Sequence, residues 1–375
     1  MTKKKTPPPS TPEKAGPVAS PLHPPVSWWA REIRPVEEGF DTAIRYRLDH
    51  LTKPLGSLGR IEEVAFWYAR LHGSDRPPAP KGFCAVFAAD HGVVAEGISA
   101  YPQAVTLQMV RNYLAGGAAI SVLSQIHGFT LRIVDVGVNG DLGTHPALLH
   151  RKVRNGTRNF AVEPAMLPAE GLQAMEAGME LAVQASESGC SLLLTGEMGI
   201  GNTTAASALA AALLRHPPED LTGSGAGLPP EGRLRKIRVI DQALARYRPL
   251  LASPLDWLFA VGGLEIAALA GFIIGGAVRR IPVILDGFIT GAAALAAVTL
   301  IPEVRPWLLA SHMSQEPGHR RILEHLGLSP LLSLDLRLGE GSGAALAYPL
   351  VVSSVELYNR MATFEEARVS QAGEG

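Results

Sequence analysis

The stretch CSLLLTGEMGIGNTTAASALAAALL, residues 190–214, decides the fold because it joins three kinds of local sequence. A short apolar run comes first, a glycine-rich loop follows, and an alanine-rich segment of helical composition completes it. The chain repeats this order, and the further apolar runs are GFCAVFAADHG, FTLRIVDVGVNG, WLFAVGG and IPVILDGF. Such repetition is typical of a parallel sheet, and continuous apolar runs fit strands buried on both faces. The sequence therefore predicts an α/β fold, a Rossmann-like parallel sheet with helices on both faces.

Segments of helical composition separate these runs. In the sheet region they are expected at Val105–Ser124, Pro168–Ser188, Thr203–Leu214, Pro230–Tyr247, Leu264–Val278 and Thr290–Leu300. After Pro302 the alternation stops, and further helices are expected at Val304–Leu309, Arg320–Leu326 and Gly343–Met361. Together with helices between Phe40 and Leu71, these predict a small all-helical domain built from the N- and C-terminal segments.

The chain of 375 residues is long enough for two domains. Its first residues hold many prolines and little that could pack, which predicts disorder. The predicted organisation is a Pro-rich tail at 1–27, a small helical domain at 28–75 and 303–365, a large α/β domain at 76–302, and a flexible tail at 366–375.

Composition excludes several classes of protein. Hydrophobic residues make up 47% of the chain and the net charge is −1, so a large core is expected and no attraction to nucleic acid or anionic membrane is indicated. No apolar stretch reaches the length of a membrane span. The two cysteines lie far apart in apolar runs, which favours buried thiols in a reducing compartment. We expect a cytoplasmic protein.

Polar residues end the apolar runs. Ligands of open α/β sheets bind at the carboxyl ends of the strands, so these side chains should converge on one rim. They are Asp90, His91, Asp135, Asn139, Glu197, Asn202 and Asp286. Asp90 and His91 could suggest a metal, but no further ligands follow at usable spacing, and no metal site is predicted.

The loop GEMGIGNTT contains a candidate phosphate site. Gly199 and Gly201 allow backbone to approach a ligand closely, and Asn202 and Thr203 are good helix-capping residues. Free N–H groups at a helix start bind anions. The spacing matches neither an NTP-binding P-loop nor G-x-G-x-x-G. An ordinary strand-to-helix turn is the alternative.

Glu340 lies between Gly339 and Gly341 in RLGEGSGAALA, at the start of a predicted helix. A carboxyl group in a dry pocket can act as a general base or acid. The alternative is a carboxylate that stabilises the helix N-terminus. The residue pattern alone leaves both open.

Other polar residues are candidates for lining a pocket. The loop at 97–102 contains Ser99 and Tyr101, and Tyr101 could stack on an aromatic ring. Lys236 could pair with phosphate or be a solvated surface lysine. Asp286 could bind a hydroxyl or a metal, or cap the next helix. The chain lacks the G-x-S-x-G elbow of serine hydrolases, so the polar residues of SHMSQEPGH are expected to line a substrate pocket. They are Ser311, His312, Ser314, Glu316 and His319.

Ten segments, in order, resemble the nicotinate-nucleotide–dimethylbenzimidazole phosphoribosyltransferase family of the cobalamin lower-ligand pathway. They are LTKPLGSLGRIE, FAADHGVVAEGISAYPQAVT, VDVGVNGD, GTRNF, GEMGIGNTTAASAL, GSGAGL, VGGLEIAALAG, PVILDGFITGAAAL, SHMSQEPGH and LRLGEGSGAALA, and they span about residues 52–351. The resemblance implies that nicotinate mononucleotide and 5,6-dimethylbenzimidazole give α-ribazole 5′-phosphate and nicotinate, with inversion at the anomeric carbon. It implies a homodimer, and it requires neither metal nor cofactor.

The resemblance also implies residue roles. Glu340 falls on the family's catalytic glutamate and would take the proton from the attacking azole. Glu197 would stabilise positive charge on the ribose. Gly199, Gly201 and Asn202, with Glu197, fall on its phosphate-side loop, and Lys236, Asp286, Ser314 and Arg337 fall on positions that resemble its substrate-pocket residues. The other predicted substrate-binding residues are Thr203, Gly339, Gly341, Tyr101 and Ser99. Tyr101 stands where some relatives carry a smaller residue. A non-catalytic nucleotide-binding or sensing module on the same fold is the alternative function, and a dinucleotide oxidoreductase is a weaker third.

Overall fold

The computed structural model describes residues 23–370, and its centre is a six-stranded sheet. The strand order is β3-β2-β1-β4-β5-β6, and every neighbouring pair is parallel. The strands are β1 (Gly82–Ala89), β2 (Thr130–Gly137), β3 (Leu148–His150), β4 (Leu192–Met198), β5 (Val283–Leu285) and β6 (Leu308–Ala310). The predicted Rossmann-like α/β fold is confirmed.

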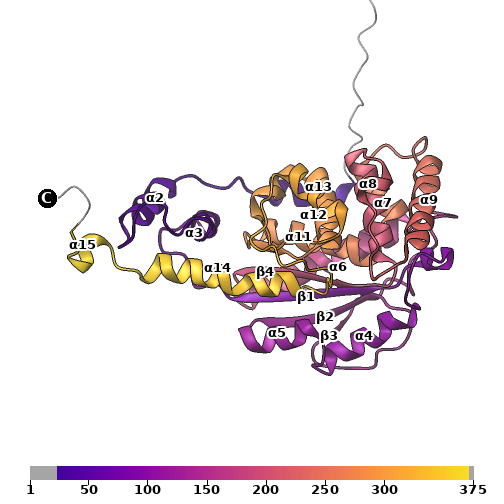
Figure 1. Cartoon of the computed structure of the whole chain (residues 1–375), viewed down its shortest axis with the longest axis horizontal. Coiled ribbons are helices and arrows are strands. Elements are labelled where there is room, and N and C mark those ends of the chain that lie inside the picture. Colours follow the sequence, from indigo (N-terminus) through magenta and orange to yellow (C-terminus); the bar gives the residue numbers. More distant parts are fainter. Residues whose placement is uncertain (1–22, 371–375) are drawn as a thin grey trace, which may run out of the picture.

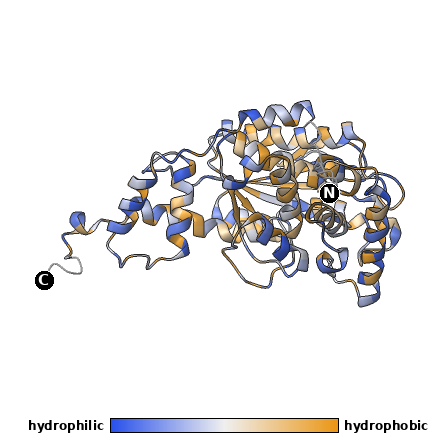
Figure 2. Ribbon diagram, turned by 90° about the horizontal axis from the view of Figure 1, so that it is seen from above, coloured by the Kyte–Doolittle hydropathy of each residue, from blue (hydrophilic) through white to orange (hydrophobic). Residues whose placement is uncertain are grey.

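Both faces of the sheet are covered by helices, as continuous apolar strands require (Figure 1). On one face α11 (Leu264–Val278) and α12 (Phe288–Leu300) pack on the strands, and α6 (Pro168–Glu187) packs on α11. On the other face lie α4 (Ala104–Leu114), α5 (Ala119–His127) and the first part of α14 (Ser342–Arg360). Figure 2 shows the apolar residues concentrated around the sheet and the polar ones on the outer helices.

Small residues set the spacing between α6 and α11. A Cβ at Gly178 would lie 1.8 Å from the Ala268 carbonyl oxygen, and one at Gly271 would lie 1.9 Å from the Met175 carbonyl oxygen. The two backbones therefore touch, which only glycine permits at these positions. This close packing makes a rigid layer against the strands that carry the polar rim.

The remaining elements surround this layer. Helices α7 (Asn202–Leu214) and α10 (Pro254–Val261) pack against α12, and α9 (Pro230–Tyr247) packs on α7. The shorter elements are α8 (Pro218–Leu221), α13 (Pro317–Leu326), η1 (Gly92–Glu96) and η2 (Pro302–Trp307).

Helices α2 (Asp41–His50) and α3 (Arg60–Leu71) lie away from the sheet, against the far end of α14 (Figure 1). They share a separate small core that includes Ile44, Ala69 and Tyr358. The short helix α15 (Phe364–Ala367) follows α14. This arrangement agrees with joining both chain ends in one helical unit, although the division into two domains stays a prediction.

Several predicted boundaries are wrong in detail at the chain ends. Helix α1 (Pro24–Glu32) begins inside the predicted tail, with Val26 buried against the sheet core, because proline fits the first turn of a helix. At the other end, α15 extends to Ala367, beyond the predicted start of the flexible tail. The rest of the two tails, 1–22 and 371–375, lies outside the described residues.

The internal predictions need three corrections. WLFAVGG is not a strand, because Ser253 caps the helix α10 that contains most of it, and a short apolar run does not distinguish the two structures. Strand β6 lies inside 303–365, which was predicted to be helical, and β3 was missed, because each has three residues. The helix predicted at Val105–Ser124 is two helices, since Gly116 has φ +83°. Among residues 23–370, no helix is long and apolar enough to cross a membrane.

Candidate active site

A cavity of about 690 Å³ opens at the carboxyl end of the sheet, where the polar residues were predicted to meet. Side chains from β4, the start of α4 and several loops line it. They are Tyr101, Val105, Met109, Glu197, Met198, Gly199, Ile200, Asn202, Thr203, Gly225, Ala226, Gly287, Phe288, Ile289, His312, Ser314, Glu316, Asp335, Leu336, Arg337, Leu338, Gly339 and Glu340. The cavity is large enough for a drug-sized ligand and combines apolar walls with a few polar groups.

The backbone around Glu340 has an unusual conformation. Gly339, Glu340 and Gly341 have φ values of +78°, +64° and +84°, so three successive residues are in the left-handed region. A glutamate is strained there, and such strain concentrates at functional sites. The glycines on either side suit this geometry, which explains the G-E-G sequence.

Asp286 holds this segment in place from the end of β5. Its Oδ1 accepts hydrogen bonds from the backbone N–H groups of Gly343 (2.7 Å) and Ala344 (3.1 Å), and its Oδ2 accepts one from Gly341 (3.1 Å). These N–H groups lie at the start of α14 and have no partner within the helix. Asp286 therefore caps α14 from a distant part of the chain.

Burial raises the pKa of Glu340 to about 7, the nearby Tyr113 hydroxyl opposes this rise, and the charge of Asp286 adds to it. Only 7% of Glu340 is exposed. A carboxyl group that titrates near neutrality can accept and release a proton under ordinary conditions. Glu340 is therefore not the capping carboxylate of α14, a role that Asp286 fills, and its chemistry suits proton transfer.

Glu197, which belongs to β4, lies beside Glu340. Its Oε2 accepts a hydrogen bond from Asn202 Nδ2, and a Cβ at Gly339 would lie 2.4 Å from its Oε1. Burial, followed by the charges of Asp286, Glu265 and Glu340, raises the pKa of Glu197 well above its usual value. The two carboxyl groups therefore share one desolvated region of the cavity.

The N-terminus of α7 faces the cavity through Asn202 and Thr203. Lys236 is fully buried behind it and donates a hydrogen bond of 2.8 Å from Nζ to Thr203 Oγ1. Burial lowers the pKa of Lys236 to about 8. A helix N-terminus with an ammonium group behind it attracts an anion such as phosphate.

Glu316 fixes the loop at Gly225, which lies beside Thr203 and Lys236. Its Oε1 accepts a hydrogen bond of 2.9 Å from the Gly225 N–H, and both residues line the cavity. Its other oxygen is buried without a hydrogen-bond partner among the described residues. The sequence grouped Glu316 with the polar residues of SHMSQEPGH as lining of a pocket, and the tertiary structure brings it against the loop at Gly225.

Nine of the predicted site residues line the cavity: Tyr101, Glu197, Gly199, Asn202, Thr203, Ser314, Arg337, Gly339 and Glu340. Five do not. Lys236, Asp286 and Gly341 lie behind the wall and position residues that do, while Ser99 and Gly201 line a smaller adjoining hollow. Ser99 Oγ donates to the Tyr101 carbonyl oxygen (3.0 Å), so it shapes the loop that presents Tyr101.

A buried pair lies beneath the glycine loop. His91 Nε2 and Glu265 Oε1 are 2.7 Å apart, and neither side chain is exposed. The imidazole packs under Gly199, where a Cβ would lie 3.3 Å from it. His91 thus acts as a hydrogen-bonded support, and no cluster of ligands suited to a metal occurs among residues 23–370.

Helix α4 contributes residues that the sequence did not single out. Val105 and Met109 line the cavity, and Tyr113 follows one turn later with its hydroxyl near Glu340. The four-residue spacing that begins at Tyr101 was the available signal. It is indistinguishable from an ordinary buried helix face without knowledge of what the helix packs against.

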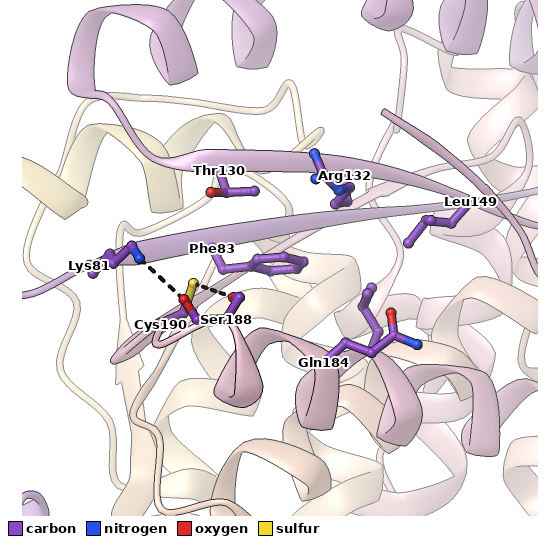
Figure 3. Close-up of a pocket in the computed structure, with 9 residues that line it drawn as sticks. Lys81, Phe83, Thr130, Arg132, Leu149, Gln184, Ser188 and Cys190 are labelled. Atoms are coloured by element: carbon purple, nitrogen blue, oxygen red, sulfur yellow. Dashed lines mark hydrogen bonds between the residues drawn. The ribbon is translucent and has the colours of Figure 1, made fainter. Parts of the chain in front are cut away.

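A second hollow of about 250 Å³ lies near the amino ends of β1 and β2, at the end of the strands opposite the large cavity (Figure 3). Lys81 Nζ donates to the Ser188 carbonyl oxygen there (3.2 Å), so the lysine satisfies the carboxyl end of α6. None of the predicted site residues lines this hollow. The chemistry therefore belongs to the larger cavity.

The cavity, with a helix N-terminus and two buried carboxyl groups in its wall, is of the kind that an enzyme acting on a small molecule requires. Comparison with known proteins gives the family. The phosphoribosyltransferase family model matches residues 33–369. This chain belongs to that family of phosphoribosyltransferases.

Individual relatives agree over nearly the whole chain. The nicotinate-nucleotide–dimethylbenzimidazole phosphoribosyltransferase of Chlorobium chlorochromatii is 52% identical over 343 residues, 92% of this chain and 97% of the relative. The protein of the same name from Chloroflexus aurantiacus is 50% identical and covers 91% of this chain and 97% of its own length. The crystal structure of CobT from Thermus thermophilus has a TM-score of 0.86 and 51% identity, covering 88% of this chain and 99% of that one.

Proposed function

We propose that this enzyme transfers the phosphoribosyl group of nicotinate mononucleotide to 5,6-dimethylbenzimidazole. The products are α-ribazole 5′-phosphate and nicotinate, with inversion at the anomeric carbon, in assembly of the cobalamin lower ligand. The names of the relatives support the substrates. The observation that carries the proposal is Glu340, a buried carboxyl with a pKa of about 7 in the wall of the cavity.

Glu340 is the general base. As the unprotonated ring nitrogen of the benzimidazole attacks the anomeric carbon, the proton on the other ring nitrogen passes to the Glu340 carboxylate. A carboxylate with a pKa near 7 accepts this proton more readily than one with an ordinary pKa. The attacking ring lies against the apolar wall formed by Val105 and Met109, with Tyr101 at the rim.

The bond from the anomeric carbon to the nicotinate nitrogen breaks at the same stage. Its electron pair returns to the pyridinium ring and neutralises it, so departure needs no acid. Positive charge that develops on the ribose is stabilised by Glu197. The cationic substrate itself favours the ionised form of Glu197, which opposes the rise in pKa that burial causes.

The phosphate of the nucleotide binds at the N-terminus of α7. Gly199 and Gly201 offer backbone N–H groups there and Asn202 begins the helix. Lys236 adds a positive charge next to Thr203. Ser314 and Arg337 line the same cavity, and Arg337 has no carboxylate partner within residues 23–370. Asp286 and Gly341 act indirectly, by fixing the backbone that carries Glu340.

A non-catalytic nucleotide-binding module remains the alternative, since the same loops would bind the nucleotide. The raised pKa of Glu340 favours catalysis, because a purely binding site gains nothing from a desolvated proton acceptor. A dinucleotide oxidoreductase is disfavoured by the absence of G-x-G-x-x-G after β1. The proposal also includes the homodimer and the cytoplasmic location implied by the resemblance.

Incubation with nicotinate mononucleotide and dimethylbenzimidazole tests the function. Formation of α-ribazole phosphate and nicotinate, followed by chromatography, is the expected result, and the anomeric configuration of the product is read by NMR. Binding of the nucleotide without turnover for any azole would establish the alternative. Sedimentation at several protein concentrations tests the dimer.

A further inference from the structure

The buried hydroxyl of Tyr113 has no hydrogen-bond partner among the described residues. Tyr113 belongs to α4 and only 3% of it is exposed. Buried polar groups are nearly always paired, so an unpaired hydroxyl in a packed interior needs an explanation. Tyrosine hydroxyls in particular find partners when buried.

The ring that carries this hydroxyl is held firmly. Tyr113 belongs to the core cluster on the α4 side of the sheet, together with Val86 and Ala88 of β1. Its carbonyl oxygen accepts a hydrogen bond of 2.9 Å from Ser121 Oγ of α5. The position of the hydroxyl is therefore set by packing on both sides of the residue.

Glu340 is the acceptor that the hydroxyl faces. The two groups are close enough for a hydrogen-bonding interaction to affect the pKa of each, although the hydroxyl has no partner at normal hydrogen-bond geometry among the described residues. Within residues 23–370, the Glu340 carboxyl accepts no other side-chain hydrogen bond, whereas the neighbouring Glu197 already accepts one from Asn202. The Tyr113 hydroxyl thus lacks an acceptor, and the Glu340 carboxyl beside it lacks a donor.

We infer that Tyr113 is a positioning residue: its hydroxyl donates a hydrogen bond to one oxygen of the ionised Glu340 carboxylate and leaves the other oxygen for the azole N–H. This inference rests on the proposed role of Glu340 as the base. The pair closes when Glu340 loses its proton, because an ionised acceptor forms the shorter and stronger hydrogen bond.

The surrounding charges support this assignment. Glu340 is faced by Tyr113 from α4, by Glu197 from β4 and by Asp286 from the end of β5. Asp286 disfavours the ionised form of Glu340, and Tyr113 favours it. Burial and the two glutamates raise the pKa of Tyr113 well above its usual value, so it stays a donor throughout the working range.

The test is the pH dependence of turnover for Tyr113→Phe, which removes the hydroxyl and keeps the ring. Without the hydrogen bond the pKa of Glu340 rises, so the acidic limb of the kcat profile moves to higher pH by roughly one unit. Activity below this limb falls about tenfold, while activity on the alkaline plateau stays within about twofold of wild type. Titration of the substrate is common to all variants and cancels in the comparison.

Tyr348→Phe is the matched control. Tyr348 is also buried on this side of the sheet, but its hydroxyl donates to the Pro80 carbonyl oxygen (3.0 Å), away from the cavity. Its profile should coincide with that of wild type. If Tyr113→Phe folds poorly, Tyr113→Met is measured in the same way.

An acidic limb that stays in place for both Tyr113 variants overturns the inference, as does an equal shift in Tyr348→Phe. A hydroxyl that is merely an unpaired buried group would instead give Tyr113→Phe a higher melting temperature and an unchanged profile. Glu340→Gln tests separately the proposal on which this inference rests, that Glu340 is the base. If that variant turns over normally, the assignment of the base is wrong, whatever Tyr113 does.

Discussion

Asp286 and Gly343 are joined by a 2.7 Å hydrogen bond from the Gly343 N–H to Asp286 Oδ1, which connects the end of β5 to the start of α14. A Cβ at Gly343 would lie 2.0 Å from His312 Nδ1 and 2.9 Å from Asp286 Oδ1, so only glycine allows this approach. The contact fixes the helix that begins directly after the Glu340 loop. The orientation of Glu340 therefore depends on a residue from another part of the chain.

Asp286→Ala should reduce both stability and turnover. It leaves the N–H groups of Gly341, Gly343 and Ala344 without their acceptor, which costs roughly 2 kcal/mol. We expect kcat to fall more than about tenfold, because the loop that carries Glu340 loses its anchor. Urea unfolding and steady-state kinetics measure the two effects.

Asp135→Ala is the control for this prediction. Asp135 is also a buried residue of the sheet, and it accepts hydrogen bonds from the N–H groups of Gly137 and Val138. It should lose comparable stability with a smaller loss of kcat. Equal losses of kcat in the two variants would mean that Asp286 acts only through stability.

Glu340→Gln should abolish turnover and also change how stability depends on pH. The folded-state pKa of about 7 is raised above the ordinary value of 4.5, so the folded protein holds this proton more tightly than the unfolded chain. Wild type therefore loses stability as pH rises from about 4.5 to about 7, by roughly 3 kcal/mol. The Glu340→Gln variant has no ionisable group at this position, so it should show no such loss of stability.

The measurement is the difference in unfolding free energy between wild type and Glu340→Gln at about pH 5 and about pH 8. The variant should gain relative to wild type at the higher pH. A constant difference would show that Glu340 is ionised with an ordinary pKa in the folded enzyme.

Gly339→Ala should inactivate the enzyme. Its φ is +78°, and a Cβ would lie 2.4 Å from Glu197 Oε1, so the substitution both strains the loop and displaces a carboxyl group of the site. Gly128→Ala is matched for backbone strain, with φ +70° and no atom within 4 Å of the added Cβ. It should lose about 1 kcal/mol of stability and keep its activity. Similar kcat values for both variants would contradict a special role for Gly339.

Lys236→Met should weaken nucleotide binding more than binding of the aromatic base. The ammonium group lies behind Thr203 at the N-terminus of α7, where the phosphate is proposed to bind. We expect KM for nicotinate mononucleotide to rise at least about tenfold, with KM for dimethylbenzimidazole within about threefold. Arg235→Met, on the same helix α9 but exposed and directed at the Gly97 carbonyl oxygen, is the control and should leave both values within about twofold of wild type. An equal rise in the two constants would place Lys236 elsewhere in the mechanism.

Local sequence determined the repeated strand, loop and helix units and the special status of Glu340 between two glycines. These features are local because apolar runs, helix starts and left-handed turns each depend on a few neighbouring residues. The short strands β3 and β6 and the helix α10 were misread for the same reason, since three to eight apolar residues do not carry a distinctive period.

The tertiary structure alone decided which polar residues at the rim lie next to one another. The sequence did not distinguish whether Glu340 caps a helix or acts as a base. In the structure the residue that caps α14 is Asp286, which is far away in the chain. The tertiary structure also brought Tyr113 of α4 and Glu316 against the site. Such contacts form only when the strands pair in their order and the helices pack on them, because burial and long-range proximity, rather than residue type, set each carboxyl's partners and pKa.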